Sequence, residues 1–168
     1  IHSLYFRCMK KLISLLPLLI LIVGCKNEVS KTHDQISPSK DVVAFFETYN
    51  KLWSEGNFEY ITSEIYDLPM TLYLQDTIHY LKSPNEVKSF LTNTFNNLEA
   101  NHYGFSKINK WENYREDGNY IIVEMNFTRF LKDSTIMGNQ FRKATYILNK
   151  KNKGFKITAM IPHTIIDK

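Results

Sequence analysis

The segment YNKLWSEGNFEYI, residues 49–61, joins two predicted helices through a single glycine. Before Gly56, apolar side chains recur every three or four residues, which is the spacing of one helix face. The members of this stripe are Val42, Phe45, Phe46, Tyr49, Leu52 and Trp53. Glycine commonly follows the last turn of a helix, and Asn57 is a good N-cap for the next. We therefore predict one helix that stops at Gly56 and a second that begins at Phe58 and buries Ile61 and Ile65.

Two further signals follow this pair of helices. The run MTLYLQDTIHYL, residues 70–81, contains two short β-rich stretches around Gln75 and Asp76 and predicts a hairpin. Next, SPNE at residues 83–86 combines an N-cap serine, a proline at the first helical position and a glutamate at the third. A third helix is therefore predicted to start there, with an inward stripe of Val87, Phe90, Leu91, Phe95 and Leu98.

From Phe105 onward the apolar spacing changes to every second residue, as in β-strands. The clearest case is the alternation of Ile121, Val123, Met125 and Phe127 with more polar neighbours. Turn residues at 117–118 and 152–154 divide this half into strands at about 105–114, 119–131, 136–149 and 154–163. Helices followed by strands predict one α+β domain over residues 41–168, with a curved antiparallel sheet covered on one face by three N-terminal helices.

This element order, with the segments YNKLWSEGNFEYI and SPNEVKSFL, resembles the nuclear transport factor 2-like superfamily, also called SnoaL-like. The resemblance covers residues 41–163 and implies a cone-shaped sheet around a cavity. In many members the strand face turned away from the helices forms a dimer. Lys156, Thr158 and Met160 are expected on that face here, and we expect a homodimer. The superfamily contains both enzymes and noncatalytic domains, so the fold leaves the function open.

The resemblance also suggests a candidate pocket. Segments that line the cavity in the superfamily carry Tyr49, Trp53, Tyr73 and Tyr146 in this chain. Aromatic residues at such positions can equally be ordinary core packing, which is the alternative to a ligand pocket. If a ligand binds, we expect the Tyr49 hydroxyl to be its polar contact, because a buried phenol needs a hydrogen-bond partner.

Ketosteroid isomerase is the best catalytic comparison within the superfamily, with an aspartate base and an oxyanion hole made by a tyrosine and a protonated aspartate. Counted from Gly56, the tyrosine falls on Tyr49, the base at or beside Tyr73 and the second aspartate at or near Ala144. Neither acidic position holds a carboxylate, so proton abstraction lacks a base. We therefore predict no catalytic residue and a noncatalytic domain that binds a small apolar ligand or a protein partner. A small-molecule lyase or isomerase is the alternative.

The N-terminal region suggests where in the cell this domain is located. The apolar run of residues 12–23 is shorter than the roughly 20 residues of a membrane-spanning helix, and it follows Met9-Lys10-Lys11. It ends in Ile22-Val23-Gly24-Cys25, which resembles the lipobox of bacterial lipoproteins. The resemblance implies a signal peptide at residues 9–24 and lipidation of Cys25, whereas the alternative is a plain signal peptide that ends near a cysteine.

Four regions follow from that interpretation. Residues 1–8 are expected to be an over-extended gene start, 9–24 the signal peptide, 25–40 the lipidated cysteine with a flexible tether, and 41–168 the domain. The predicted location is the bacterial cell envelope, after export across the cytoplasmic membrane and with the lipid on Cys25 in a membrane.

Charge and residue spacing argue against other functional classes. Without residues 1–24, which hold Arg7, Lys10 and Lys11, 18 of the 21 basic residues remain against 17 acidic ones, so we predict no nucleic-acid partner. The histidines lack the close pairing of a helical metal motif, and we predict no metal site and no cofactor. The basic run of residues 149–156 is interpreted as a solvated hairpin tip, with contact to anionic lipid headgroups as the alternative.

Overall fold

The computed structural model describes residues 37–163. Cys25 and the predicted signal peptide and tether up to residue 36 therefore lie outside the described residues. The elements in chain order are α3 (Lys40–Ser54), α4 (Phe58–Tyr60), the π-helical turn η2 (Ile61–Ile65), β1 (Tyr66–Leu74), β2 (Thr77–Leu81), α5 (Pro84–Glu99), β3 (Tyr103–Asp117), β4 (Tyr120–Leu131), β5 (Arg142–Lys151) and β6 (Gly154–Pro162). Within residues 37–163, no helix has the length and apolar character that a membrane crossing requires.

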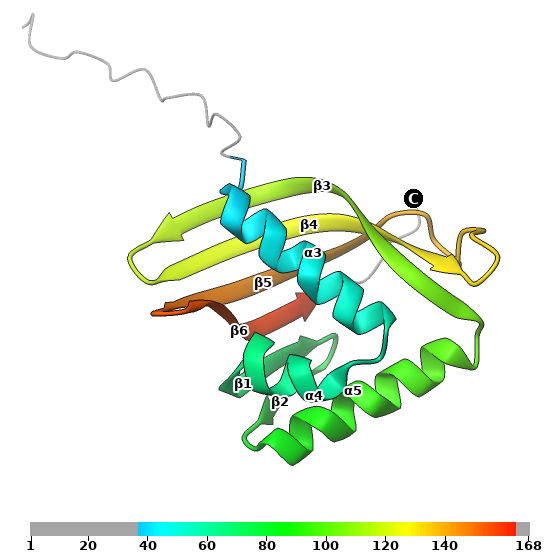
Figure 1. The fold of residues 1–168 in the computed structure, drawn as a ribbon, viewed down its shortest axis with the longest axis horizontal. Helices are drawn as coiled ribbons and strands as arrows, with labels where there is room; N and C mark the ends of the chain where they lie inside the picture. The colour runs from blue at the N-terminus through cyan, green and yellow to red at the C-terminus, as the bar shows by residue number, and fades with distance from the viewer. Residues whose placement is uncertain (1–36, 164–168) are drawn as a thin grey trace, which may run out of the picture. The chain divides into compact units, whose positions relative to one another are not determined.

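The strands form one curved, unclosed sheet in the order β2-β1-β6-β5-β4-β3 (Figure 1). The neighbours β1 and β6 run parallel, whereas the other pairs are antiparallel. The predicted α+β class is confirmed, but the prediction of a purely antiparallel sheet is wrong at this one pair. A parallel neighbour requires a crossover, and here β2, α5 and strands β3 to β5 separate β1 from β6 along the chain.

Helix α5 begins where the sequence predicts, and α3 also begins after a serine cap, which was not predicted. The Ser39 hydroxyl accepts a hydrogen bond from the Val42 amide at 3.3 Å, and the Ser83 hydroxyl accepts one from the Glu86 amide, also at 3.3 Å. Gly56 follows α3 with a φ of +67°, a conformation that favours glycine. In Figure 1, α3 crosses one face of the sheet in front of β3 to β6, and α5 lies beside α4, β1 and β2.

The hydrophobic core lies between these helices and the face of the sheet that they cover. Phe46 of α3 and Leu91 of α5 are fully buried, and the β4 residues Ile121 and Val123 lie in the same cluster. The predicted inward stripe of β4 is therefore confirmed as part of the core. The stripe is buried because alternate side chains of a strand point to one face of the sheet.

Two predicted elements differ in extent from the structure. The second helix is a three-residue α4 followed by the π-helical turn η2, and β5 begins at Arg142 rather than near residue 136. The segment between β4 and β5 turns instead, with positive φ at Ser134 and Gly138. Thr128 and Ile136 hold this connection against β4, through a hydrogen bond to the Gln140 carbonyl and a bridge to Phe130.

A register shift in β6 changes which of its residues face the helices. Ile157 lies opposite Leu148, and Ala159 lies opposite the next residue of β5, Ile147, so the chain has one extra residue at this point. Met160 consequently pairs with Tyr146 and faces the interior. The expectation that Met160 shares the outer face with Lys156 and Thr158 is wrong for this reason.

Candidate functional site

An internal cavity of about 300 Å³ lies between α3, α5 and the face of the sheet that the helices cover. Most of its wall is apolar and includes Phe90 of α5, Met125 and Phe127 of β4, and Met160 and Pro162 of β6. Concave, mostly apolar hollows with a few polar groups are the usual form of small-molecule sites, and this volume lies at the lower end of their range. The cavity is therefore the best candidate for a functional site.

Two of the three tyrosines of the cavity wall are hydrogen-bonded to each other. The Tyr49 hydroxyl lies 2.7 Å from the Tyr66 hydroxyl, and both residues are buried. The Tyr146 ring packs with its centroid 6.0 Å from that of Tyr49. Burial raises the pKa of all three phenols, so they are neutral at physiological pH. The Tyr49 hydroxyl thus already has one protein partner, and its expected role as the polar contact of a ligand stays a prediction.

The structure brings together three of the four residues predicted for the pocket. Tyr49, Trp53 and Tyr146 all line the cavity. Trp53 also packs against the rings of Phe58 and Phe95, at centroid distances of 5.8 and 6.3 Å. These ring contacts fix the indole at the α3 side of the cavity.

Tyr73 is the predicted pocket residue that lies elsewhere. Its side chain is 40% exposed and lines a separate surface hollow near the β1–β2 turn. Its neighbour Leu74 lines the cavity instead, because successive strand residues point to opposite faces. The position compared with the isomerase base therefore presents to the cavity only an aliphatic side chain that cannot take up a proton.

Arg129 is a cavity residue that the sequence interpretation missed. It lies on β4 opposite Ser106 of β3, and both residues line the cavity. The Nε atom of Arg129 is buried without a hydrogen-bond partner, and its Cζ atom lies 5.8 Å from the centre of the Phe127 ring. Burial, with a further contribution from the nearby charge of Arg142, lowers the pKa of Arg129. The signal was present in the sequence, because the β4 alternation reaches Arg129 when it is extended two residues past Phe127.

The described residues offer little for acid–base or metal chemistry. None of the described residues that line the cavity is an aspartate or a glutamate. Across residues 37–163, no three histidine, cysteine, aspartate or glutamate side chains come close enough together to hold a metal ion. The one formal charge on the described cavity wall is thus the guanidinium of Arg129.

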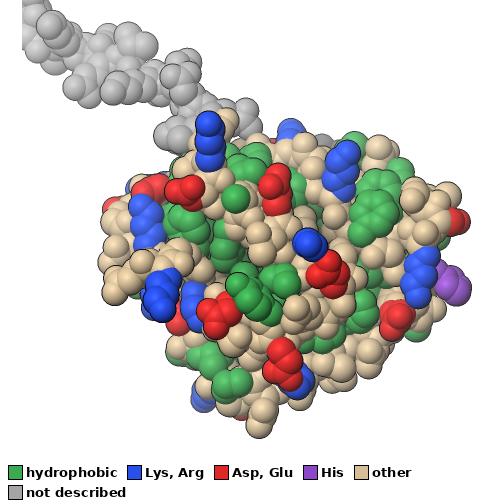
Figure 2. All heavy atoms as spheres, viewed as in Figure 1, with side chains coloured by type: hydrophobic (Ala, Val, Ile, Leu, Met, Phe, Trp, Pro, Cys, Tyr) green, Lys and Arg blue, Asp and Glu red, His purple; other side chains and the backbone are tan. Residues whose placement is uncertain are grey.

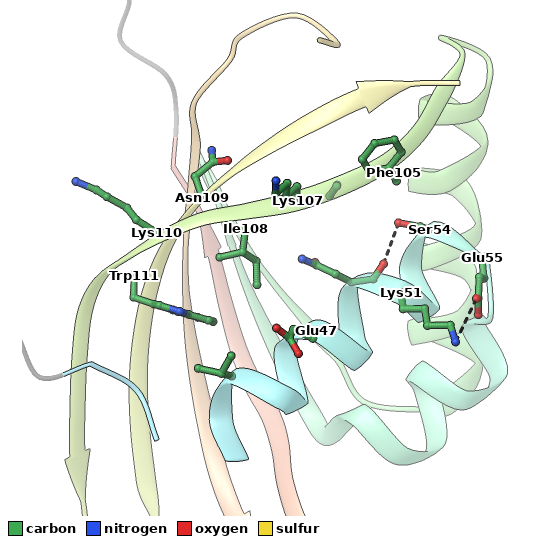
Figure 3. Close-up of a pocket in the computed structure, with 13 residues that line it drawn as sticks. Glu47, Lys51, Ser54, Glu55, Phe105, Lys107, Ile108, Asn109, Lys110 and Trp111 are labelled. Carbon is green, nitrogen blue, oxygen red and sulfur yellow. Dashed lines mark hydrogen bonds and ion pairs between the residues drawn. The ribbon is translucent and has the colours of Figure 1, made fainter. Parts of the chain in front are cut away.

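A second hollow, of about 590 Å³, runs along the surface between α3 and β3 (Figure 3). Figure 3 shows Trp111 and Ile108 pointing toward α3, whereas Lys110 points away from it. Part of its polar rim is engaged in ion pairs within the protein, Lys51 with Glu55 at 3.9 Å and Lys110 with Glu112 at 2.8 Å. We therefore regard this groove as a weaker candidate than the internal cavity.

The basic hairpin tip also finds partners within the domain. Lys150 pairs with Glu116, Lys151 pairs with Asp67 at 2.7 Å, and the Lys156 ammonium donates to the Ser63 carbonyl. Figure 2 shows basic and acidic side chains interspersed over the viewed face of the molecule. The interpretation of the tip as a lipid-headgroup site therefore gains no support from the geometry.

Solved structures similar to this chain share its fold at low sequence identity. An NTF2-like protein with a cystatin-like fold from Novosphingobium aromaticivorans matches with a TM-score of 0.61 and 10% identity, over 76% of this chain and 82% of that one. A candidate aromatic ring hydroxylase from the same organism matches with a TM-score of 0.58 and 12% identity, over 76% of this chain and 88% of that one. A candidate dehydratase of the NTF2-like family from Streptomyces avermitilis matches with a TM-score of 0.58 and 11% identity, over 76% of this chain and 95% of that one.

Sequence comparison places the chain in a family. A search of curated proteins finds no match. The model of the NTF2-like protein family DUF6841 matches residues 39–165, which include every helix and strand described above. The chain therefore belongs to this NTF2-like family.

Proposed function

We propose that the protein is a noncatalytic binding domain that takes up a small apolar ligand in the internal cavity. The observation that carries the proposal is the cavity itself, a mostly apolar space of about 300 Å³ with no carboxylate on its described wall. A pocket of this kind is largely preformed, so a ligand gains apolar burial without first ordering the wall. We further propose that a lipid on Cys25 holds this domain at a membrane of the bacterial envelope, as the lipobox-like segment suggests.

A small-molecule lyase or isomerase is the second candidate function. It is favoured by the fold that the chain shares with the candidate dehydratase of Streptomyces avermitilis. Fold alone does not transfer a reaction, and the cavity wall described here lacks the carboxylate that would act as a base. A protein partner at the surface is the remaining alternative, and the groove between α3 and β3 would be its place.

The proposal is tested by asking whether the cavity binds a small molecule. The full chain purified from its own host is examined by native mass spectrometry, and the Cys25→Ser chain is screened by thermal shift against small apolar acids, alcohols and lipids. We expect a co-purifying mass or a rise in Tm with some members of the panel. Each binder is also monitored for turnover.

Variants connect any binding to the cavity. Ala144 is buried in the cavity wall, so Ala144→Leu should fill part of the space and weaken binding. Ala100→Leu makes the same change at an exposed position after α5 and should bind as the parent does. No co-purifying mass, no thermal shift and no difference between the two variants would contradict the proposal, and turnover of a screened compound would favour the enzyme instead.

A further inference from the structure

Arg129 has no counter-charge within the described part of the chain. No ion pair joins Arg129 or the neighbouring Arg142 to a carboxylate in residues 37–163. The Nε atoms of both guanidinium groups are buried without a hydrogen-bond partner. Arg142 of β5 lies opposite Phe127 of β4, and its Nη2 atom donates a hydrogen bond to the Met137 carbonyl at 3.3 Å. The end of the sheet next to the cavity thus holds two positive charges close together.

This arrangement is unfavourable without an anion. Both arginines are partly buried, so their guanidinium groups lose part of their hydration, and the mutual repulsion of the two groups adds to that cost. Both effects appear in the lowered pKa of Arg129, which results mainly from burial and then from the charge of Arg142. An anionic group in the cavity beside Arg129 would offset both effects.

The shape and polarity of the cavity indicate which kind of anion fits. A guanidinium binds a carboxylate through two parallel hydrogen bonds, and its planar fork suits that geometry. Only one of the two guanidinium groups lines the described cavity wall, where Ser106 lies opposite it with its hydroxyl 2.9 Å from that of Tyr103. The rest of the nearby wall is apolar, including Met125, Phe127 and Met160. A ligand with one negative charge on an apolar body matches this single guanidinium and apolar wall better than a dianion does.

We propose that the ligand is a small monocarboxylic acid, held with its carboxylate on Arg129 and its apolar body against the β4 and β6 side chains. This inference rests on the proposed function, since it names the chemical class of the ligand for the same cavity. Arg142 does not line the cavity, but its charge acts on Arg129 and adds to the attraction of a carboxylate there. The phenols of Tyr49 and Tyr66 share a hydrogen bond and are neutral, so the one positive charge that the described cavity wall offers a carboxylate is that of Arg129.

The test compares ligands that differ only in the head group. Octanoate, octanol and octyl phosphate form one series, and phenylacetate with phenylethanol forms a second with a different body. Binding to the Cys25→Ser full chain is measured by calorimetry. We expect the acid to bind about tenfold or more tightly than its alcohol, the usual gain from a hydrogen-bonded charge. The variant Arg129→Gln should remove this preference and keep the affinity for the alcohol.

Controls separate recognition from folding. Arg115→Gln removes an exposed arginine on a different strand, β3, that does not line the cavity, and should preserve the preference for the acid. Without ligand, Arg129→Gln should have a Tm equal to or above that of the parent, because it removes a buried charge that lacks a partner. Should Arg129→Gln fail to fold, Arg129→Lys is used instead, and it should lower the preference without abolishing it, since lysine lacks the planar fork.

The outcomes distinguish this inference from the function on which it rests. Equal affinity for acid and alcohol, unchanged in Arg129→Gln, would overturn the carboxylate assignment and leave cavity binding intact. Tightest binding of octyl phosphate would overturn it in favour of a phosphate ester. Failure of every compound in both series to bind would contradict the carboxylate assignment, and failure of the wider panel and of native mass spectrometry as well would contradict the binding function.

Discussion

Tyr49 and Tyr66 place two hydroxyl groups 2.7 Å apart inside the core, next to the ring of Tyr146. At the scale of single residues, such a pair is stable only while both phenols keep their protons, because a buried phenolate would lose its hydration. Burial is accordingly the main cause of the raised pKa of each of these tyrosines. The three phenols therefore make the core sensitive to high pH.

We predict that alkaline pH unfolds the protein through these tyrosines. Their pKa in the folded state lies above the ordinary value of 10.0, so above that pH the folded state binds more protons than the unfolded state. Their contribution to stability is complete below pH 10 and falls as the pH rises further. Phenolate absorbance from these residues should appear together with loss of the far-ultraviolet circular dichroism signal.

A double variant checks the assignment of this alkaline transition. Tyr49→Phe with Tyr66→Phe removes both groups of the hydrogen-bonded pair, so no hydroxyl of that pair is left unsatisfied. The midpoint of alkaline unfolding should then move to higher pH. A midpoint that stays where the parent has it would show that other groups control the transition.

At the scale of elements, the start of α5 is the best-defined local structure. The Ser83 hydroxyl accepts from the Glu86 amide, and the Glu86 carboxylate accepts from the Lys82 amide at 2.7 Å. The same helix supplies Phe90 to the cavity wall and Phe95 to the ring cluster around Trp53. The cap therefore positions side chains well beyond the first turn.

We predict that Ser83→Ala lowers the free energy of unfolding by about 1 kcal/mol, because one amide at the helix start loses its acceptor. Urea unfolding of the Cys25→Ser chain measures the change. Ser83→Asp keeps an acceptor at the same position and should retain most of the stability. If the alanine and aspartate variants lose the same free energy, the cap is not the source of the effect.

Local signals explain why parts of this architecture could be predicted from the sequence. The helix at Ser83 and the buried stripe of β4 depend on residues within a few positions of one another, so periodicity and capping reveal them. The parallel pairing of β1 with β6 brings together residues such as Leu72 and Met160 that are distant in sequence, and no local pattern specifies that neighbour. The one-residue register shift in β6 likewise changes which face of the sheet the later β6 side chains point to, and no local sequence pattern indicates it.

The candidate site shows the same division. Tyr49 and Trp53 could be placed on one helix face by their spacing, and both line the cavity. Tyr73 could not, because the facing of a strand residue depends on where the strand pairs. Arg129 continues the predicted β4 stripe, but its importance comes from the absence of a partner across the described cavity wall, and only packing reveals that.

At the scale of the whole molecule, the outer face of the sheet carries a polar network. Glu124 accepts hydrogen bonds from the Lys143 ammonium at 2.9 Å and from the Thr145 hydroxyl at 3.2 Å. The Nε2 atom of His163 lies 2.8 Å from the Thr145 hydroxyl and 3.7 Å from the Glu124 carboxylate. Such exposed pairs contribute little to stability, but they determine which surfaces can come together. The homodimer through this face stays a prediction.

We predict that Cys25→Ser releases the protein from membranes, since only the thiol can receive the diacylglycerol. Fractionation of the producing bacterium and partition into detergent measure the change. Mutation of a nearby polar residue of the tether region, Ser30→Ala, serves as the control and should leave membrane association unchanged. Equal membrane retention of the Cys25→Ser chain and the parent would overturn the lipoprotein interpretation.

The central place of β6 has a consequence for the order of assembly. This strand is the last of the sheet to leave the ribosome, yet it is the sole connection between the β2-β1 pair and the β5-β4-β3 group. Until β6 is available, both groups present unpaired edges, which readily associate with other chains. The complete sheet can therefore form only after β6 has been synthesised, and a chain that lacks β6 is left with two separate half-sheets.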